Sequence, residues 1–329
     1  MKWLILSSLI FLLCFISCSE APKEPQNQSA STNTILITDS QNNLVNQLNL
    51  KSGDLSPLIS SGITAQPIDI MAVGNNAYVL LSGTPSALRK FDLNAGKWAG
   101  TVSFSDGTYP QQIAYDGKYF YISFQSGKML AAVSASDFTS GATVSLSQYA
   151  QGLCYSSGSV YVCLSDGYAS SPAYANSRVA ILSTANLSGT ISNIQTLVNP
   201  LFVTSDENGT IYIACAGNYN NDGGITKITS GAPTNIVLNK SLSSIAVSNG
   251  IIYASENNNG IDIYKSDGTF ITNVINSVNI FDLIIYQNYV YALGSGKIYK
   301  ININNNSLEA TYSGVITGTW GGAIAIYSK

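Results

Sequence analysis

The chain has 329 residues and a formal net charge of −3, with 45% hydrophobic and only 10% charged residues. It contains 20 Tyr and 28 Gly but no histidine. Tyrosine and glycine favour strands and tight turns, and the slightly acidic balance gives no electrostatic footprint for nucleic acid. Without histidine, Ser-His and Cys-His nucleophile pairs are excluded, and the commonest neutral metal ligand is missing.

Residues 1–17 have the features of a signal peptide. Lys2 is followed by the apolar stretch Leu4–Ile16, which is too short for an ordinary membrane-spanning helix. The small Ser17 precedes Cys18, and Phe15-Ile16-Ser17-Cys18 resembles a bacterial lipobox, with Phe15 where that family usually has leucine. The resemblance implies cleavage before Cys18, lipidation of Cys18 and firm attachment to a membrane through its acyl chains. An ordinary secretory signal that is cut nearby is the alternative.

Residues 18–33 contain the cysteine and a polar, proline-containing segment without hydrophobic periodicity. Such composition predicts a disordered tether that holds the folded part away from the bilayer. Ser19, rather than aspartate, follows the cysteine, and by resemblance this favours the outer membrane of a Gram-negative cell envelope.

A strand with a leading tyrosine then recurs through the chain. Its steps of 42, 43, 40, 51, 41 and 38 residues join seven equivalent positions: Leu36, Tyr78, Tyr121, Tyr161, Tyr212, Tyr253 and Tyr291. A period near 40, filled by short strands and turns, indicates the blades of a β-propeller. Each repeat divides into four strands, named a to d in chain order, and a Gly- or Asn-containing corner joins a to b in most repeats.

The two ends of the repeat region complement each other. ILITDS, residues 35–40, is a strand b without its strand a, whereas GGAIAIYSK, residues 321–329, is a strand a without its strand b. We therefore predict an all-β, seven-bladed propeller over residues 34–329, with a closing blade shared by the N- and C-terminal strands.

The recurring G-x-x-Y-[VI] phrase resembles YVTN-type and NHL-type seven-bladed propellers of secreted bacterial proteins. No repeat has the complete Tyr-Val-Thr-Asn. The resemblance covers residues 34–329 and implies the fold rather than an activity, since propellers host many functions.

Two long b–c connections, residues 165–178 and 216–224, fall on consecutive blades. The candidate binding residues on them are Tyr168, Tyr174, Asn176, Tyr219, Asn220 and Asp222. Tyrosine offers contact area with a polar tip, which suits a protein, peptide or glycan. The alternative is that Asn and Gly build turns while the tyrosines cover neighbouring blades. The NYNNDGG segment also invites a calcium interpretation, but with Asp222 as its one carboxylate we favour a turn.

The start of strand a faces the mouth of the central channel. The equivalent residues there are Asp69, Gln112, Gly152, Phe202, Ser244 and Asp282. Asp69 and Asp282 should lie on the two blades that flank the closing blade. Two carboxylates at one mouth could bind a cation or raise each other's pKa, although we expect solvated carboxylates here.

Three cysteines remain in the propeller region. Cys154 and Cys163 flank one hairpin corner in a diagonal arrangement that is unfavourable for a disulfide, and Cys215 has no evident partner. We expect buried cysteines that act as small hydrophobic residues.

Together these features predict a monomeric cell-envelope lipoprotein whose non-catalytic propeller binds a protein, peptide or glycan without a cofactor. The alternative is a Ca²⁺-dependent hydrolase, similar to lactonase propellers, that uses Asp69 and Asp282. By resemblance, a lactonase-like propeller needs a Glu/Asn/Asp calcium set, and no glutamate occupies the aligned positions.

Overall fold

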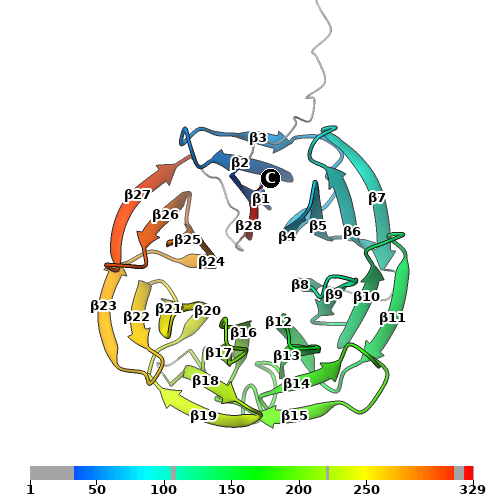
Figure 1. Ribbon diagram of the computed structural model, residues 1–329. Helices are drawn as coiled ribbons and strands as arrows, with labels where there is room; N and C mark the ends of the chain where they lie inside the picture. Colours follow the sequence, from blue (N-terminus) through cyan, green and yellow to red (C-terminus); the bar gives the residue numbers. More distant parts are fainter. Residues whose placement is uncertain (1–32, 105–108, 220–221, 315–321, 329) are drawn as a thin grey trace, which may run out of the picture.

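The computed structural model describes residues 33–104, 109–219, 222–314 and 322–328, and it contains seven four-stranded antiparallel sheets. The sheets are arranged in a ring around a central channel (Figure 1). The prediction of a seven-bladed propeller is therefore confirmed. No helix in the described residues is long and apolar enough to cross a membrane.

Six blades are contiguous in the chain, and strand a of each lies nearest the channel (Figure 1). Blade 1 contains β4 (Gln66–Val73), β5 (Asn76–Ser82), β6 (Ser86–Asp92) and β7 (Lys97–Phe104). Blade 2 contains β8 (Pro110–Tyr115), β9 (Tyr119–Phe124), β10 (Met129–Ser134) and β11 (Ser140–Ser145). Blade 3 contains β12 (Tyr149–Ser156), β13 (Ser159–Ser165), β14 (Arg178–Ser183) and β15 (Ser192–Gln195).

The second half of the ring has the same organisation. Blade 4 contains β16 (Pro200–Ser205), β17 (Ile211–Cys215), β18 (Gly224–Thr229) and β19 (Ala232–Val237). Blade 5 contains β20 (Leu242–Ser248), β21 (Ile251–Glu256), β22 (Gly260–Lys265) and β23 (Phe270–Ile275). Blade 6 contains β24 (Ile280–Tyr286), β25 (Tyr289–Gly294), β26 (Lys297–Asn302) and β27 (Ser307–Ser313).

The closing blade joins the two ends of the repeat region. Its strand order is β28 (Ile324–Tyr327), β1 (Thr34–Asp39), β2 (Leu44–Asn49) and β3 (Leu55–Ile59). β28 pairs antiparallel with β1, so that Thr34 faces Tyr327 and Ile37 faces Ile324. Beyond that register, Thr38 donates its backbone N–H to the Ala323 carbonyl at 3.0 Å, and its hydroxyl accepts from the Ala323 N–H at 2.7 Å. The predicted shared blade is confirmed.

The repeated tyrosine packs at the joint between its own blade and the next. Tyr78 of β5 is 4% exposed, and its ring centroid lies 4.1 Å from that of Phe120 in blade 2. Leu36 takes the same place in the closing blade, where it packs in one buried cluster with Ile70 and Ala77 of blade 1. The repeat therefore encodes the inter-blade core, because a residue of this kind on strand b fills the space between two twisted sheets.

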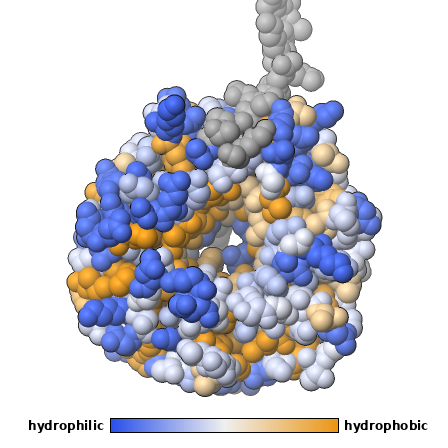
Figure 2. Space-filling model, in the orientation of Figure 1, coloured by the Kyte–Doolittle hydropathy of each residue, from blue (hydrophilic) through white to orange (hydrophobic). Residues whose placement is uncertain are grey.

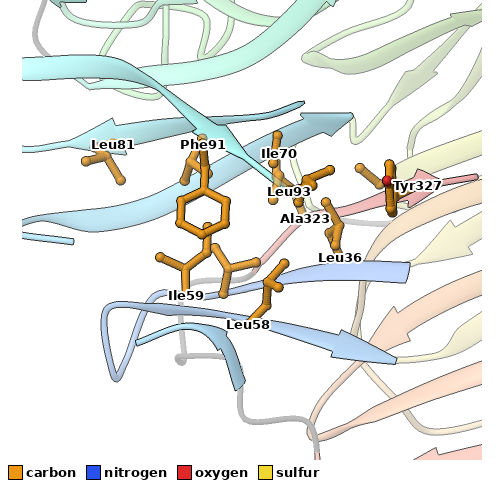
Figure 3. Close-up of a cluster of buried hydrophobic side chains, with 13 residues drawn as sticks. Leu36, Leu58, Ile59, Ile70, Leu81, Phe91, Leu93, Ala323 and Tyr327 are labelled. Atoms are coloured by element: carbon orange, nitrogen blue, oxygen red, sulfur yellow. The ribbon is translucent and has the colours of Figure 1, made fainter. Parts of the chain in front are cut away.

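The joint between the closing blade and blade 1 shows this packing in detail. Side chains from β1, β3, β28 and blade 1 point toward one another in Figure 3. They are Leu36, Leu58, Ile59, Ile70, Leu81, Phe91, Leu93, Ala323 and Tyr327. This apolar cluster holds strands from both termini, so ring closure and core burial depend on the same residues.

We expect Tyr327→Ala to lower the free energy of unfolding by about 3–5 kcal/mol, the usual cost of removing a buried aromatic ring. Tyr327 is 2% exposed and packs at the ring-closing joint. Urea denaturation of the two proteins measures the difference. Tyr109→Ala is a matched control, since Tyr109 is 63% exposed and should change stability by no more than about 0.5 kcal/mol. Equal effects of the two substitutions would contradict the closing role of Tyr327.

Candidate functional site

The b–c and d–a connections of a four-stranded blade emerge on the same face of the ring, which we call the loop face. The two long connections lie on it: residues 166–177 join β13 to β14 in blade 3, and residues 216–223 join β17 to β18 in blade 4. Blades 3 and 4 are neighbours in the ring (Figure 1). The two connections can therefore form one surface.

Three tyrosines from these connections contact one another, and we call them the tyrosine ridge. The ring of Tyr174 lies between those of Tyr168 and Tyr219, with both pairs of centroids 6.1 Å apart and edge-to-face. Tyr168 is 77% exposed and Tyr219 47% exposed. The sequence predicted these residues on adjacent connections, and the structure brings them together with a large part of their surface in solvent.

Hydrogen bonds hold the blade 3 part of the ridge in place. The carboxylate of Asp166 accepts from the side-chain amide of Asn176 at 2.6 Å and from that of Gln148 at 2.9 Å. These two bonds are the main reason that the pKa of Asp166 lies below its usual range. The Tyr174 N–H also donates to the Gly167 carbonyl at 2.8 Å. Asn176, predicted as a binding residue, is thus also a brace, and sequence reasoning missed its partners Asp166 and Gln148.

The blade 4 part has its own brace. Asp222 accepts from the backbone N–H of Asn218 at 2.7 Å and from its side-chain amide at 3.0 Å. Asp222 therefore closes a turn, in agreement with the turn interpretation of NYNNDGG. Asn220, the remaining candidate of this connection, lies outside the described residues.

The backbone on the ridge adopts a conformation that large side chains rarely take. The φ angles of Tyr174, Asn176 and Tyr219 are 53°, 55° and 61°. A bulky residue in this left-handed region is strained and persists only where its surroundings fix it. The hydrogen bonds of Asp166 and Asp222 support the backbone of these connections.

The central channel is the second candidate site, and Figure 2 shows it as an opening in the middle of the ring. Its cavity of about 470 Å³ is lined by residues of strand a, including Asp69, Gln112 and Asp282. Asp69 and Asp282 lie on blades 1 and 6, which flank the closing blade as the sequence indicated.

The two aspartates connect neighbouring blades. Asp69 accepts from its neighbour Ile70 N–H at 2.8 Å and from the Ile113 N–H of blade 2 at 2.6 Å. Asp282 accepts from the Leu283 N–H at 2.8 Å and from the Ile324 N–H of the closing blade at 2.9 Å.

The equivalent residue of blade 2, Gln112, makes the same inter-blade bond to the Leu153 N–H of blade 3, at 2.9 Å. A register irregularity in the a–b pairing falls at the start of strand a in all six contiguous blades. These side chains therefore satisfy backbone N–H groups at the joints between blades.

The expectation of solvated carboxylates is wrong for Asp69, which is only 9% exposed. Burial, and then the negative charge of Asp282, raise the pKa of Asp69 to about 8. Burial raises the pKa of Asp282 to about 6. The donated backbone N–H groups act in the opposite direction on both carboxyls, but burial dominates because the low dielectric disfavours the charged form.

The described residues contain no group of three or more His, Cys, Asp or Glu that could hold a metal ion. The three cysteines are free thiols that pack in one apolar cluster between blades 3 and 4. Burial raises the pKa of Cys154 and of Cys215 to about 12, so these thiols stay protonated and poorly nucleophilic at neutral pH. The interpretation of these cysteines as small hydrophobic residues is confirmed for Cys163 and Cys215, which are fully buried, while Cys154 is partly exposed.

No protein-family model matches the chain, and no curated protein matches it by sequence. Several solved structures have a similar fold. A proposed 6-phosphogluconolactonase from Bacteroides uniformis is 15% identical, with a TM-score of 0.67 over 90% of this chain and 100% of that one. A similar proposed enzyme from Bacteroides fragilis is 14% identical, with a TM-score of 0.65 over 91% and 98% of the two chains. A Lactobacillus plantarum protein is 14% identical, with a TM-score of 0.64 over 91% and 100%. At such identities the likeness establishes the propeller fold alone.

We expect the free energy of unfolding to fall as the pH rises from 6 to 8. In this range the unfolded Asp69 carboxyl, with a pKa near 3.8, has lost its proton, whereas the folded one keeps it up to about pH 8. The folded state then binds more protons, so stability decreases by at most about 1.4 kcal/mol per pH unit for one group.

Urea denaturation at several pH values measures this slope, and Asp69→Asn should flatten it. Asp282→Asn should flatten it only in part, because the Asp282 carboxyl, with a pKa of about 6, titrates at lower pH, while its charge contributes less than burial to the raised pKa of Asp69. If the free energy of unfolding changes equally between pH 6 and 8 in the unchanged protein and in Asp69→Asn, the raised pKa assigned to Asp69 is contradicted.

Proposed function

We propose that this protein is a cell-envelope lipoprotein whose propeller is a non-catalytic binding module, with the tyrosine ridge as its contact surface. The observation that carries the proposal is the ridge itself. Three tyrosines from two consecutive blades touch edge-to-face while Tyr168 and Tyr219 remain 77% and 47% exposed. Tyrosines that only covered neighbouring blades would be buried, as Tyr78, Tyr121 and Tyr212 are.

The chemistry of the ridge suits a protein, peptide or glycan partner. Tyrosine rings offer a large flat contact area at a small cost in side-chain entropy, and their hydroxyls add hydrogen bonds. The hydrogen bonds of Asp166 and Asp222 brace the connections that carry these tyrosines before binding, which reduces the free energy spent on ordering the surface. The nearby carboxylates of Asp166 and Asp222 are engaged in bracing the connections.

The position of the N-terminal strand fits display of the ridge away from a membrane. β1 is a strand b, so its first residue lies on the a–b face of the ring, opposite the loop face. Asn33 there accepts a hydrogen bond from the Tyr286 hydroxyl at 3.2 Å, and Tyr286 ends a strand a on that same face. A tether of residues 18–33 with a lipid on Cys18 would thus attach behind the ridge. The outer membrane remains part of this proposal through Ser19.

We expect crosslinking and pull-down from intact cells to recover a defined partner with the Cys18-anchored protein. Replacement of Tyr168, Tyr174 and Tyr219 by Ala should reduce the recovery at least tenfold, because the contact surface is removed. Phe270→Ala is the matched control, since Phe270 is 55% exposed but lies on the outer strand β23 of blade 5. Recovery of the same partner at an equal yield by the triple variant would contradict a binding role for the ridge.

The carboxyl pair of the channel supports a second candidate, a Ca²⁺-dependent hydrolase similar to lactonases. Asp69 and Asp282 both border the channel and have raised pKa values, and two of the similar structures are proposed 6-phosphogluconolactonases. Against it, all four carboxyl oxygens already accept backbone N–H groups.

A thermal melt with calcium or with a chelator tests the second candidate. A cation held at 100 times its dissociation constant stabilises the fold by about 2.7 kcal/mol. This function therefore requires a higher melting temperature in calcium, and a smaller rise for Asp282→Asn. Identical melting under the two conditions rejects it.

A further inference from the structure

A second cleft of about 290 Å³ lies between blade 1 and the connection that follows β3. It opens beside the b–c connection of blade 1, which places it on the loop face but two blades away from the ridge. Leu81, part of the ring-closing core in Figure 3, forms one side of it. Its polar lining consists of one guanidinium and four hydroxyls: Arg89, Thr64, Thr84, Thr101 and Ser103.

Arg89 is fixed in this cleft by three contacts. Its Nε donates to the Thr101 hydroxyl at 3.2 Å, and its Nη1 donates to the Gly62 carbonyl. The guanidinium carbon lies 3.8 Å from the ring centroid of Trp98, in the stacked arrangement that arginine favours on aromatic faces. Its position is therefore set before any ligand arrives, and Nη2 has no acceptor among the described residues.

The positive charge of Arg89 is not balanced nearby. No described acidic side chain forms an ion pair with it, whereas Lys240 pairs with Glu256 and Asp262, and Lys300 with Glu309. Burial lowers the pKa of Arg89, with no carboxylate acting in the opposite direction. An arginine always carries its charge in proteins, so a partly buried one without a counter-ion attracts an anion.

The hydroxyls define which anion fits. Those of Thr64, Thr84 and Ser103 form no hydrogen bond with other described residues, and each can donate and accept. One guanidinium matches the single charge of a carboxylate, which it binds through paired N–H donors. Hydroxyl groups on the ligand would pair with the threonine and serine side chains, as polar groups do in ligand sites of this size.

We propose that the Arg89 cleft binds a hydroxylated monocarboxylate of the sugar-acid class, such as the uronic acid unit of an acidic glycan. The carboxylate pairs with the free side of the guanidinium, and the sugar hydroxyls face Thr64, Thr84 and Ser103. This site is independent of the tyrosine ridge.

Isothermal titration of the detergent-solubilised full-length protein with glucuronate tests the proposal. We expect saturable binding that weakens at least tenfold in Arg89→Gln and severalfold in a Thr84→Val/Ser103→Ala variant. The second variant is needed because Arg89 also holds Gly62, and thermal melts verify that each variant is folded. Glucose, which lacks the carboxylate, should bind at least tenfold more weakly.

A protein in which Tyr168, Tyr174 and Tyr219 are all alanine should bind glucuronate with unchanged affinity, which separates this site from the ridge. No saturable binding of glucuronate, or equal affinity in all the cleft variants, would overturn the proposal. So would equal binding of glucose, which would indicate neutral sugars. Tighter binding of inorganic phosphate would overturn it in favour of a phosphate site.

Discussion

The pairing of β28 with β1 is the constraint on which the rest of the molecule depends. This hydrogen-bonded contact joins Thr34–Ile37 to Ile324–Tyr327 across almost the whole length of the chain. It removes the two exposed sheet edges that an open row of blades would present. It also closes the ring in which the strands a line a central channel.

Each inter-blade joint in this ring has an apolar anchor, and three joints also have a polar bridge. The anchor is the residue at the repeated tyrosine position, and the bridge, in three joints, is the side chain of Asp69, Gln112 or Asp282 to the next blade's backbone. A buried backbone N–H without a partner costs about 1–3 kcal/mol, so these bridges stabilise the fold by accepting from such groups. Two carboxyls at a channel mouth look like catalytic groups in the sequence, yet hydrogen bonding to neighbouring blades accounts for their position.

Much of the fold could be predicted because it depends on repetition. The tyrosine period gave the number of blades, and the unmatched strands at residues 35–40 and 321–329 indicated the shared blade. The position of the tyrosine ridge could also be predicted, because the sequence shows two long b–c connections on consecutive blades. Its contacts confirm that Tyr168, Tyr174 and Tyr219 lie together.

Other features depend on contacts between blades that no local pattern reveals. The carboxylate of Asp69 accepts from the Ile113 N–H of blade 2, at a place where the a–b register of that blade is irregular. The Arg89 cleft arises where the connection after β3 crosses blade 1, and its residues come from positions 64 to 103. The brace of Asp166 by Gln148 joins two separate connections. In all three cases the partner is distant in the sequence and has no distinctive motif.

Tyrosine footprinting on intact cells is the most direct measurement of the central claim, that the ridge is the working surface of an envelope-anchored protein. Purified protein and cell-displayed protein would be treated with a membrane-impermeant tyrosine reagent and compared residue by residue after digestion. We expect Tyr168 and Tyr219 to be modified in the purified protein and protected in its native envelope, while Tyr109 is modified in both, as its 63% exposure allows. Equal modification of the ridge in the two samples, with Tyr109 accessible in both, would contradict its role in binding.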